Sequence, residues 1–130
     1  MVTGCNRGIG LELVRQLMAR GDTVLAVCRQ SSAALEATGA EIVAGIDVGQ
    51  GADMGKLKAA VGDRRIDVLL NNAGILRRDA FGELDYEGMI EQFRVNTLGA
   101  LRDTEALIDV RRDFSNLADI PENQSWRKYR

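Results

Sequence analysis

The sequence predicts an α/β fold built on a doubly wound parallel sheet. Three observations support this class: short β-branched runs alternate with segments of helical period, the runs are apolar on both faces, and the links between them are short. Strands buried on both faces occur in parallel sheets, and helices that join parallel strands make right-handed crossovers. The 130 residues form one domain or part of one.

The chain opens on a very short predicted strand, Met1-Val2-Thr3, which leads directly into a glycine-rich turn. A helix follows the turn, because Ile9, Leu13 and Leu17 recur every four residues and form one apolar face. Gly21 fits the end of this helix, since glycine readily adopts the left-handed conformation that closes many helices.

Further along the chain, apolar runs predict three more strands, at residues 23–28, 41–46 and 66–70. The intervening and following segments predict helices at residues 33–38, 52–61 and 85–108. For four parallel strands joined in this way we expect the strand order 3-2-1-4, which is typical of dinucleotide-binding sheets.

Composition excludes several classes of function. The formal net charge is −2, which gives no basic footprint for nucleic acid. No apolar run approaches the ~20 residues that a membrane span needs, and the start of the chain does not resemble a signal peptide. Histidine is absent, and Cys5 and Cys28 are too few for a zinc site. We therefore expect a cytoplasmic protein that binds no metal, nucleic acid or membrane.

The glycine-rich turn, residues 3–10, carries the first functional signal. Free backbone N–H groups at a helix N-terminus bind phosphate, and glycine lets the backbone approach a pyrophosphate closely. Such turns also occur without a ligand, but a strand before and a helix after favour dinucleotide binding. A Walker loop is excluded because no Gly-Lys-Ser/Thr follows. The turn therefore predicts a Rossmann-type sheet that binds a dinucleotide.

The end of the second predicted strand indicates which dinucleotide is bound. An acidic residue about 20 residues past such a turn favours the free ribose of NAD, whereas Arg accommodates the 2′-phosphate of NADP. Here the strand ends at Cys28-Arg29 without a carboxylate, and Arg7 adds a second guanidinium. We therefore expect NADP, with NAD as the alternative.

Four motifs resemble those of the short-chain dehydrogenase/reductase family. They are the turn Thr3-Gly4-x-x-x-Gly8-Ile9-Gly10, the dipeptide Asp47-Val48, the run Asn71-Asn72-Ala73-Gly74, and Asn96 within Val95-Asn96-Thr97. Their order and spacing agree with the family over about residues 1–108, and the flanking residues are similar to its C-factor-like branch. The resemblance implies an oxidoreductase that moves a hydride between a nicotinamide cofactor and a small carbonyl or alcohol.

The resemblance also assigns roles to single positions. Asp47-Val48 matches the position that contacts adenine in the family, and Asn96 matches a helix asparagine that helps to hold a proton-relay water, so we expect Asn96 in the catalytic group. The expected cofactor-binding residues are Thr3, Gly4, Asn6, Arg7, Gly8, Ile9, Gly10, Arg29, Asp47, Val48, Asn72, Ala73 and Gly74.

Physical reasons support three of these positions. At the end of a buried strand, the amides of Asn71 and Asn72 can satisfy main-chain groups of a neighbouring strand, and Gly74 keeps the wall beside the cofactor open. Asn96 falls within a predicted helix although asparagine is a poor helix former. We expect its side chain to bind a carbonyl or a water at a helix irregularity.

The sequence departs from the family at the catalytic residues. The family uses a Ser and a Tyr-x-x-x-Lys pair, in which the Lys ammonium lowers the Tyr pKa. Here Ile90 stands four residues after Tyr86, and only Arg130 follows Tyr129. Ser115 precedes Tyr129 by 14 residues, which we interpret as coincidence because no Lys follows. We expect a truncated chain with negligible hydride transfer.

Three alternatives remain open: an NAD(P)-dependent short-chain oxidoreductase, catalytically complete only in a longer form; a non-catalytic dinucleotide-binding or interaction protein; and a non-functional remnant. We expect residues 1–101 to form the dinucleotide-binding portion and residues 102–130, of which 12 are charged, to form a divergent tail. An open strand edge at residues 66–70 and an apolar stripe of Met89, Phe93 and Leu101 predict a homo-oligomer.

Overall fold

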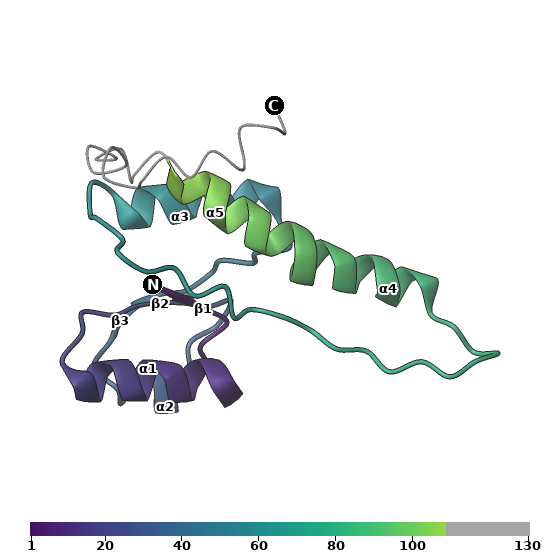
Figure 1. Ribbon diagram of the computed structural model, residues 1–130, viewed down its shortest axis with the longest axis horizontal. Coiled ribbons are helices and arrows are strands. Elements are labelled where there is room, and N and C mark those ends of the chain that lie inside the picture. Colours follow the sequence, from purple (N-terminus) through teal and green to yellow (C-terminus); the bar gives the residue numbers. More distant parts are fainter. Residues whose placement is uncertain (109–130) are drawn as a thin grey trace, which may run out of the picture.

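A computed structural model describes residues 1–108 of the chain, and its path is shown in Figure 1. The element order is β1 (Val2–Thr3), α1 (Gly8–Arg20), β2 (Leu25–Val27), α2 (Ala33–Glu36), β3 (Glu41–Val43), η1 (Gly51–Asp53), α3 (Met54–Val61), α4 (Tyr86–Phe93), η2 (Arg94–Gly99) and α5 (Ala100–Ile108). The expectations for residues 109–130, including Ser115 and Tyr129, fall outside the described residues.

The three strands form a parallel sheet in the order β1-β2-β3, which confirms the predicted α/β class. Val2 pairs with Ala26 of β2, and Ala26 pairs with Ile42 of β3. Helices cover both faces of the sheet: α1 and α2 lie on one face, and α3 and α5 lie on the other (Figure 1). None of the described helices is both long and apolar enough to cross a bilayer.

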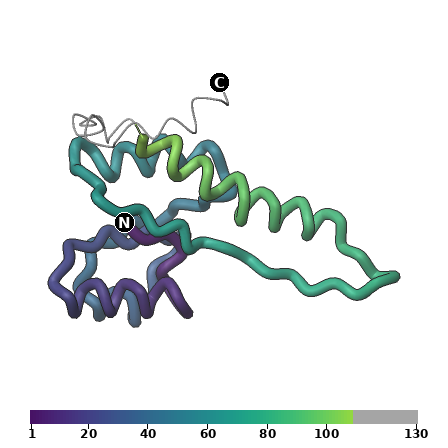
Figure 2. The backbone as a smooth tube through the Cα atoms, in the orientation of Figure 1, coloured from purple at the N-terminus to yellow at the C-terminus, as the bar shows by residue number. Residues whose placement is uncertain are grey.

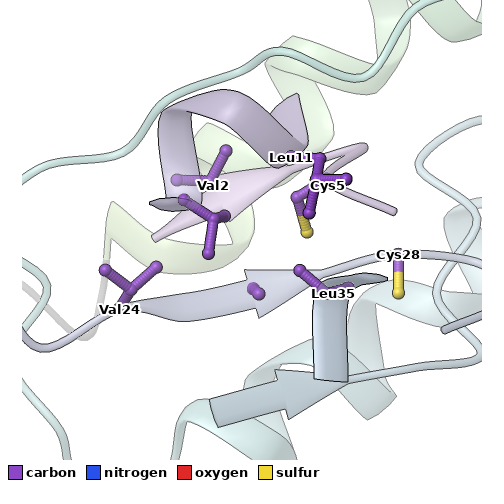
Figure 3. Close-up of a cluster of buried hydrophobic side chains, with 8 residues drawn as sticks. Val2, Cys5, Leu11, Val24, Cys28 and Leu35 are labelled. Carbon is purple, nitrogen blue, oxygen red and sulfur yellow. The ribbon is translucent and has the colours of Figure 1, made fainter. Parts of the chain in front are cut away.

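Each face of the sheet has its own apolar core. On the α1 face, Val2, Val14 and Leu35 are fully buried in one cluster, part of which is shown in Figure 3. On the α3 face, Leu57 and Leu107 belong to a second cluster that includes inward residues of β2. Burial on both faces explains why the strand sequences are apolar throughout instead of alternating.

The predicted fourth strand at residues 66–70 does not form. This segment makes a single parallel bridge, between Val2 and Leu70, in which Leu70 accepts from Thr3 N (3.1 Å) and donates to Met1 O (2.9 Å). β1 has two residues, and both pair with β2, whereas only Val2 pairs with the 66–70 segment. Val68 is 58% exposed, although its apolar run predicted burial. The segment lies next to β1, but the sheet has only three strands within residues 1–108. The predicted four-strand order 3-2-1-4 is therefore not observed there.

Glycine and capping residues fix most element ends. Gly21 ends α1 in the left-handed conformation, with φ 90°, as predicted. Gly45 has φ 80°, and β3 stops before it instead of reaching residue 46. Asp85 caps α4 by accepting from Gly88 N at 2.9 Å. The predicted helix 33–38 is shorter, ending at Glu36, and the predicted helix 52–61 begins with the short 3-10 helix η1.

The predicted helix 85–108 is interrupted by a π-helical segment. α4, η2 and α5 follow one another without a break, and η2 has π-helical hydrogen bonding. Together with the loop that precedes it, the α4 end of this helix extends well beyond the sheet, as Figure 2 shows. We call residues 76–93, the loop and α4, the arm. π-Helical turns inside α-helices are frequent at functional sites.

Candidate functional site: a pocket at the carboxyl ends of the strands

A pocket of about 330 Å³ lies at the carboxyl ends of the strands. Twelve of the thirteen residues expected to bind the cofactor line it: Gly4, Asn6, Arg7, Gly8, Ile9, Gly10, Arg29, Asp47, Val48, Asn72, Ala73 and Gly74. Thr3, the thirteenth, is buried below the pocket. In open α/β sheets ligands bind at this edge. The structure therefore brings together residues from four separate motifs.

Close packing explains two of the three glycines in the turn. A Cβ on Gly10 would stand 2.4 Å from both Gly4 O and Asn72 Nδ2, and a Cβ on Gly4 would stand 2.6 Å from Ala73 Cα. Real Cβ atoms do not approach other atoms so closely, so these positions need glycine. The turn and the Asn72-Ala73 segment are thus in backbone contact.

Gly8 is required for a different reason. Its φ is +57°, which disfavours side chains, but a Cβ there would meet nothing within 4 Å. The space above Gly8 is therefore open, and it lies on the lining of the pocket. A backbone segment that is open to solvent at this point leaves room for a ligand to approach its amides.

The N-terminus of α1, which starts at Gly8, lacks a side-chain cap. Arg7 occupies the cap position without making a capping hydrogen bond, and no acidic residue lies in the first turn. By contrast, Ser32 caps α2 and Asp85 caps α4. The first backbone N–H groups of a helix need acceptors, and its dipole favours an anion there. α1 therefore presents amide donors to the pocket.

Thr3 and Asn72 hold the turn against the neighbouring segment. Asn72 Nδ2 donates to Thr3 O (2.9 Å) and Gly4 O (3.1 Å), while the backbone N–H groups of Asn72 and Ala73 donate to Thr3 Oγ1 (3.2 and 3.1 Å). Asn72 thus satisfies main-chain groups of a neighbouring strand, as we expected. Asn71, in contrast, is exposed and turns toward Thr104 Oγ1 (3.3 Å) of α5.

Asn96 lies in the π-helical segment and holds the opposite wall of the pocket. Its Oδ1 accepts from Ile75 N, and its Nδ2 donates to Ile75 O, both at 2.8 Å. A Cβ on Gly74 would stand 3.3 Å from Asn96 Oδ1, so this wall is closely packed. The side chain therefore binds a carbonyl at a helix irregularity, as its sequence position indicated. Its role in catalysis stays a prediction.

The loop after β3 forms the third wall. Asp47 Oδ1 accepts from Gly49 N (2.9 Å), and Asp47 N donates to Asp53 Oδ2 (3.0 Å). Lys56 and the Asp47 amide lower the pKa of the Asp53 carboxyl, so it stays ionised and keeps accepting from the loop. These bonds turn Val48 inward, where it is buried and lines the pocket.

Arg7 and Arg29 lie on the lining of the pocket with exposed side chains. Neither forms an ion pair within residues 1–108, whereas Arg20, Arg64 and Arg77 do. A second hollow, lined by Arg29, Gln30 and Gly45, adjoins Asn6 and Asp47 of the main pocket. Two unpaired guanidinium groups make this rim suited to an anion.

Sequence reasoning missed the apolar lining of the pocket. Val27, Cys28, Ile46, Ile75 and Val95 line it, next to the motif residues in sequence or space. Burial raises the pKa of the Cys28 thiol. Burial and the neighbouring Cys28 together raise the pKa of the Cys5 thiol to about 12, so both thiols stay protonated. The sequence signal that could have predicted this lining is a small apolar residue at the end of each strand.

The sequence model of the family described as short chain dehydrogenase matches residues 1–113. The chain belongs to this family. A dehydrogenase of 1-hydroxy-2-glutathionyl-2-methyl-3-butene from Rhodococcus sp. is 35% identical over 109 residues, which are 82% of this chain and 48% of that protein. A 3-oxoacyl-[acyl-carrier-protein] reductase from Synechocystis sp. is 33% identical over 82% of this chain and 47% of its own length.

Solved structures of short-chain dehydrogenases have the same fold. A short-chain dehydrogenase from Streptomyces avermitilis superposes with a TM-score of 0.73 at 32% identity, covering 83% of this chain and 43% of that chain. An NADPH-bound carbonyl reductase from chicken fatty liver superposes with a TM-score of 0.72 at 28% identity, covering 84% and 50%. This short-chain dehydrogenase chain thus spans about half the length of the relatives it matches.

Proposed function

We propose that this chain binds NADP(H) as the cofactor-binding half of an oxidoreductase that acts on a small carbonyl or alcohol. The observation that carries the proposal is the uncapped N-terminus of α1, which faces a pocket next to the open space above Gly8. Three features that pyrophosphate binding needs therefore occur together: free amides, a favourable helix dipole and no side chain in the way.

Each wall of the pocket has a place in this proposal. The amides of Gly8, Ile9 and Gly10 would hold the pyrophosphate, and Asp47 with Val48 would contact the adenine. The Asn72–Gly74 segment would lie along the remainder of the cofactor. When bound, the nicotinamide ring supplies or accepts the hydride.

NADP is favoured over NAD because of the two arginines. Arg7 and Arg29 have no ion-pair partner within residues 1–108, and a 2′-phosphate would offer each a charge-assisted hydrogen bond. The carbonyl reductase from chicken fatty liver, whose fold this chain shares, was solved with NADPH bound.

Turnover by these 130 residues is a separate question. No Tyr-x-x-x-Lys pair occurs in the sequence, and Tyr86 is 68% exposed at the start of α4. A positioned acid or base contributes about 10²–10⁴-fold to rate. We therefore propose that this chain binds the cofactor with negligible hydride transfer. Of the catalytic group, we propose that it contributes Asn96.

We also propose that the protein is cytoplasmic and that it self-associates. Met89, Phe93 and Leu101 are 38%, 56% and 62% exposed, so the apolar stripe predicted from the sequence is only partly covered within residues 1–108. Burying such a stripe against a second copy removes apolar surface from water, which stabilises the pair by about 25 cal/mol for each Å² buried. We propose that the helical region α4–α5 pairs two chains.

The test is titration of the purified chain with NADPH and with NADH, followed by cofactor fluorescence. We expect tighter binding of NADPH, and we expect Arg29→Asp to weaken NADPH by about 10–100-fold while NADH changes little, since hydrogen bonds to charged groups are worth ~1.5–3 kcal/mol. Arg15→Asp, on the exposed side of α1, is the charge-matched control.

The outcomes test cofactor binding and turnover separately. Binding without turnover across a panel of carbonyl compounds supports the proposal and the non-catalytic class together. Measurable turnover contradicts the proposed lack of catalysis. If a folded chain binds neither nucleotide, the proposal is wrong.

A further inference from the structure

Arg102 lies at the start of α5, in the segment that the sequence assigned to a divergent tail. Its Nη1 donates to Gly49 O at 3.0 Å, across 53 residues of sequence. Its Nε lies 3.8 Å from the position of a Cβ on Gly51, so the guanidinium spans the turn that follows Val48. The side chain is half-buried there.

The same helical segment packs closely against this loop at two other points. A Cβ on Gly99 would stand 2.8 Å from Val48 Cγ2, and a Cβ on Gly49 would stand 3.1 Å from Val95 Cγ2. A side chain at Gly99 would therefore need Val48 to shift, and one at Gly49 would be in tight contact with Val95. Arg102 adds the only charged contact of this set within the described residues.

The loop itself is held mainly from one side. Asp53 accepts from Asp47 N, and Asp47 Oδ1 accepts from Gly49 N, so these bonds fix its first half. Beyond Gly49 the described hydrogen bonds are Gln50 N to Asp47 O (2.9 Å), Asp53 N to Gln50 O (3.1 Å) and the Arg102 contact, which is the one that reaches α5. Without Arg102, the Gly49 carbonyl loses its tie to α5.

We propose that Arg102 is a positioning residue for the adenosine end of the dinucleotide pocket, because it fixes the loop that presents Asp47 and Val48. This inference rests on the proposed function. It predicts that losing Arg102 weakens only the half of the ligand that meets this loop. The pyrophosphate and nicotinamide ends, which meet the α1 turn and Gly74, are held by other contacts.

The experiment compares Arg102→Met with wild type in the full chain, using NADPH and 2′,5′-ADP as ligands in calorimetry. Arg102→Met keeps the aliphatic stem and removes the donors. We expect Kd to rise about tenfold for both ligands and by the same factor, because both contain the adenosine half, and a hydrogen bond from a charged donor is worth ~1.5 kcal/mol or more. Arg102→Lys, which keeps one donor, recovers part of the loss.

Arg94→Met is the matched control, since Arg94 is an exposed arginine of the same helical segment, and we expect Kd within about twofold of wild type. Amide hydrogen exchange gives a readout that needs no cofactor. Without Arg102, the amides of residues 48–50 should exchange faster, while those of α1 stay unchanged. If Arg102→Met does not fold, Arg102→Gln, which is too short to span the same gap, takes its place with the same expectations.

Two results overturn the inference. One is unchanged affinity for 2′,5′-ADP in a folded Arg102 variant. The other is a larger loss for NADPH than for 2′,5′-ADP, which would show a general disturbance of the pocket. If wild type binds neither ligand, the proposed function fails instead, and hydrogen exchange at residues 48–50 still tests whether Arg102 holds the loop.

Discussion

The pocket end of the sheet and the arm differ in how completely they are packed. At the pocket end, Thr3 is 1% exposed, and its hydroxyl and carbonyl both bond the Asn72-Ala73 segment. In the arm, Leu76 is 78% exposed, Phe81 is fully exposed and Ile90 is 50% exposed. The first region therefore obtains its order from contacts within the chain, whereas the second leaves apolar surface for something else to cover.

The glycines make the same contrast. Within the turn, added Cβ atoms on Gly4 and Gly10 would overlap backbone atoms. In the arm, a Cβ on Gly82 would meet nothing within 4 Å, and one on Gly88 would meet only the side chains of Asp85 and Arg77. Gly55 in α3 also has open space around it. Overlap with backbone is costly because packed interiors do not expand easily. The pocket end should thus tolerate substitution poorly and the arm well, and the following predictions test that difference.

The largest effect is expected from Gly10→Ala. The added methyl would stand 2.4 Å from Gly4 O and Asn72 Nδ2, so the turn must separate from the Asn72 segment. We expect the free energy of unfolding to fall by about 3 kcal/mol or more, as for strongly overpacked cores, and NADPH binding to be lost. Urea unfolding followed by circular dichroism measures the first effect.

Gly55→Ala is the control for this prediction. Gly55 lies inside α3 with open space around it, so alanine should stabilise the chain by about 0.5–1 kcal/mol through helix propensity. Equal stability of the Gly10 and Gly55 variants would contradict the close packing of the pocket end, because it would show that the turn is no more tightly packed than an open helix.

This contrast also explains what the sequence could predict. The turn, Asn72 and Asn96 carry their signal in residue type, because a backbone contact demands glycine and an asparagine in a helix needs a partner. The missing fourth strand could not be read from residues 66–70, since strand pairing depends on a neighbour far along the chain, where only the Val2–Leu70 bridge forms. Arg102 had no local signal either, because its partner Gly49 is 53 residues away.

The buried carboxyl of Asp103 is another feature without a sequence signal. It is 1% exposed on α5, and its Oδ1 has no hydrogen-bond partner within the described residues. Burial raises the pKa of Asp103 from 3.8 to about 6. The folded chain thus holds this proton more tightly than the unfolded chain, so the contribution of Asp103 to stability is full below about pH 4 and is lost as pH rises to about 6.

Asp103→Asn is therefore expected to have the second-largest effect. Above pH 6 the variant should be more stable than wild type by about 1–3 kcal/mol, and near pH 4 the two should be equal, because wild type is then protonated. Urea unfolding at pH 4.5, 6 and 7.5 measures the difference. Asp63→Asn, which makes the same change at an exposed position, is the control. A gain that is the same at every pH would contradict the assignment to this carboxyl.

The smallest effect is expected in the helical region that leads out of the sheet, where Phe93→Ser tests whether a second copy covers the apolar stripe. Phe93 is 56% exposed, so the free energy of unfolding of the single chain should change by no more than about 0.5 kcal/mol. Self-association should weaken by about fivefold to tenfold, because the buried part of the ring is worth ~1 kcal/mol. Sedimentation velocity at micromolar concentration measures this, with Glu87→Ser as an exposed control in α4. A wild-type chain that sediments only as a compact monomer would show that no second copy covers the stripe. The pocket end and the arm would then differ in packing, but the arm would have no role in assembly.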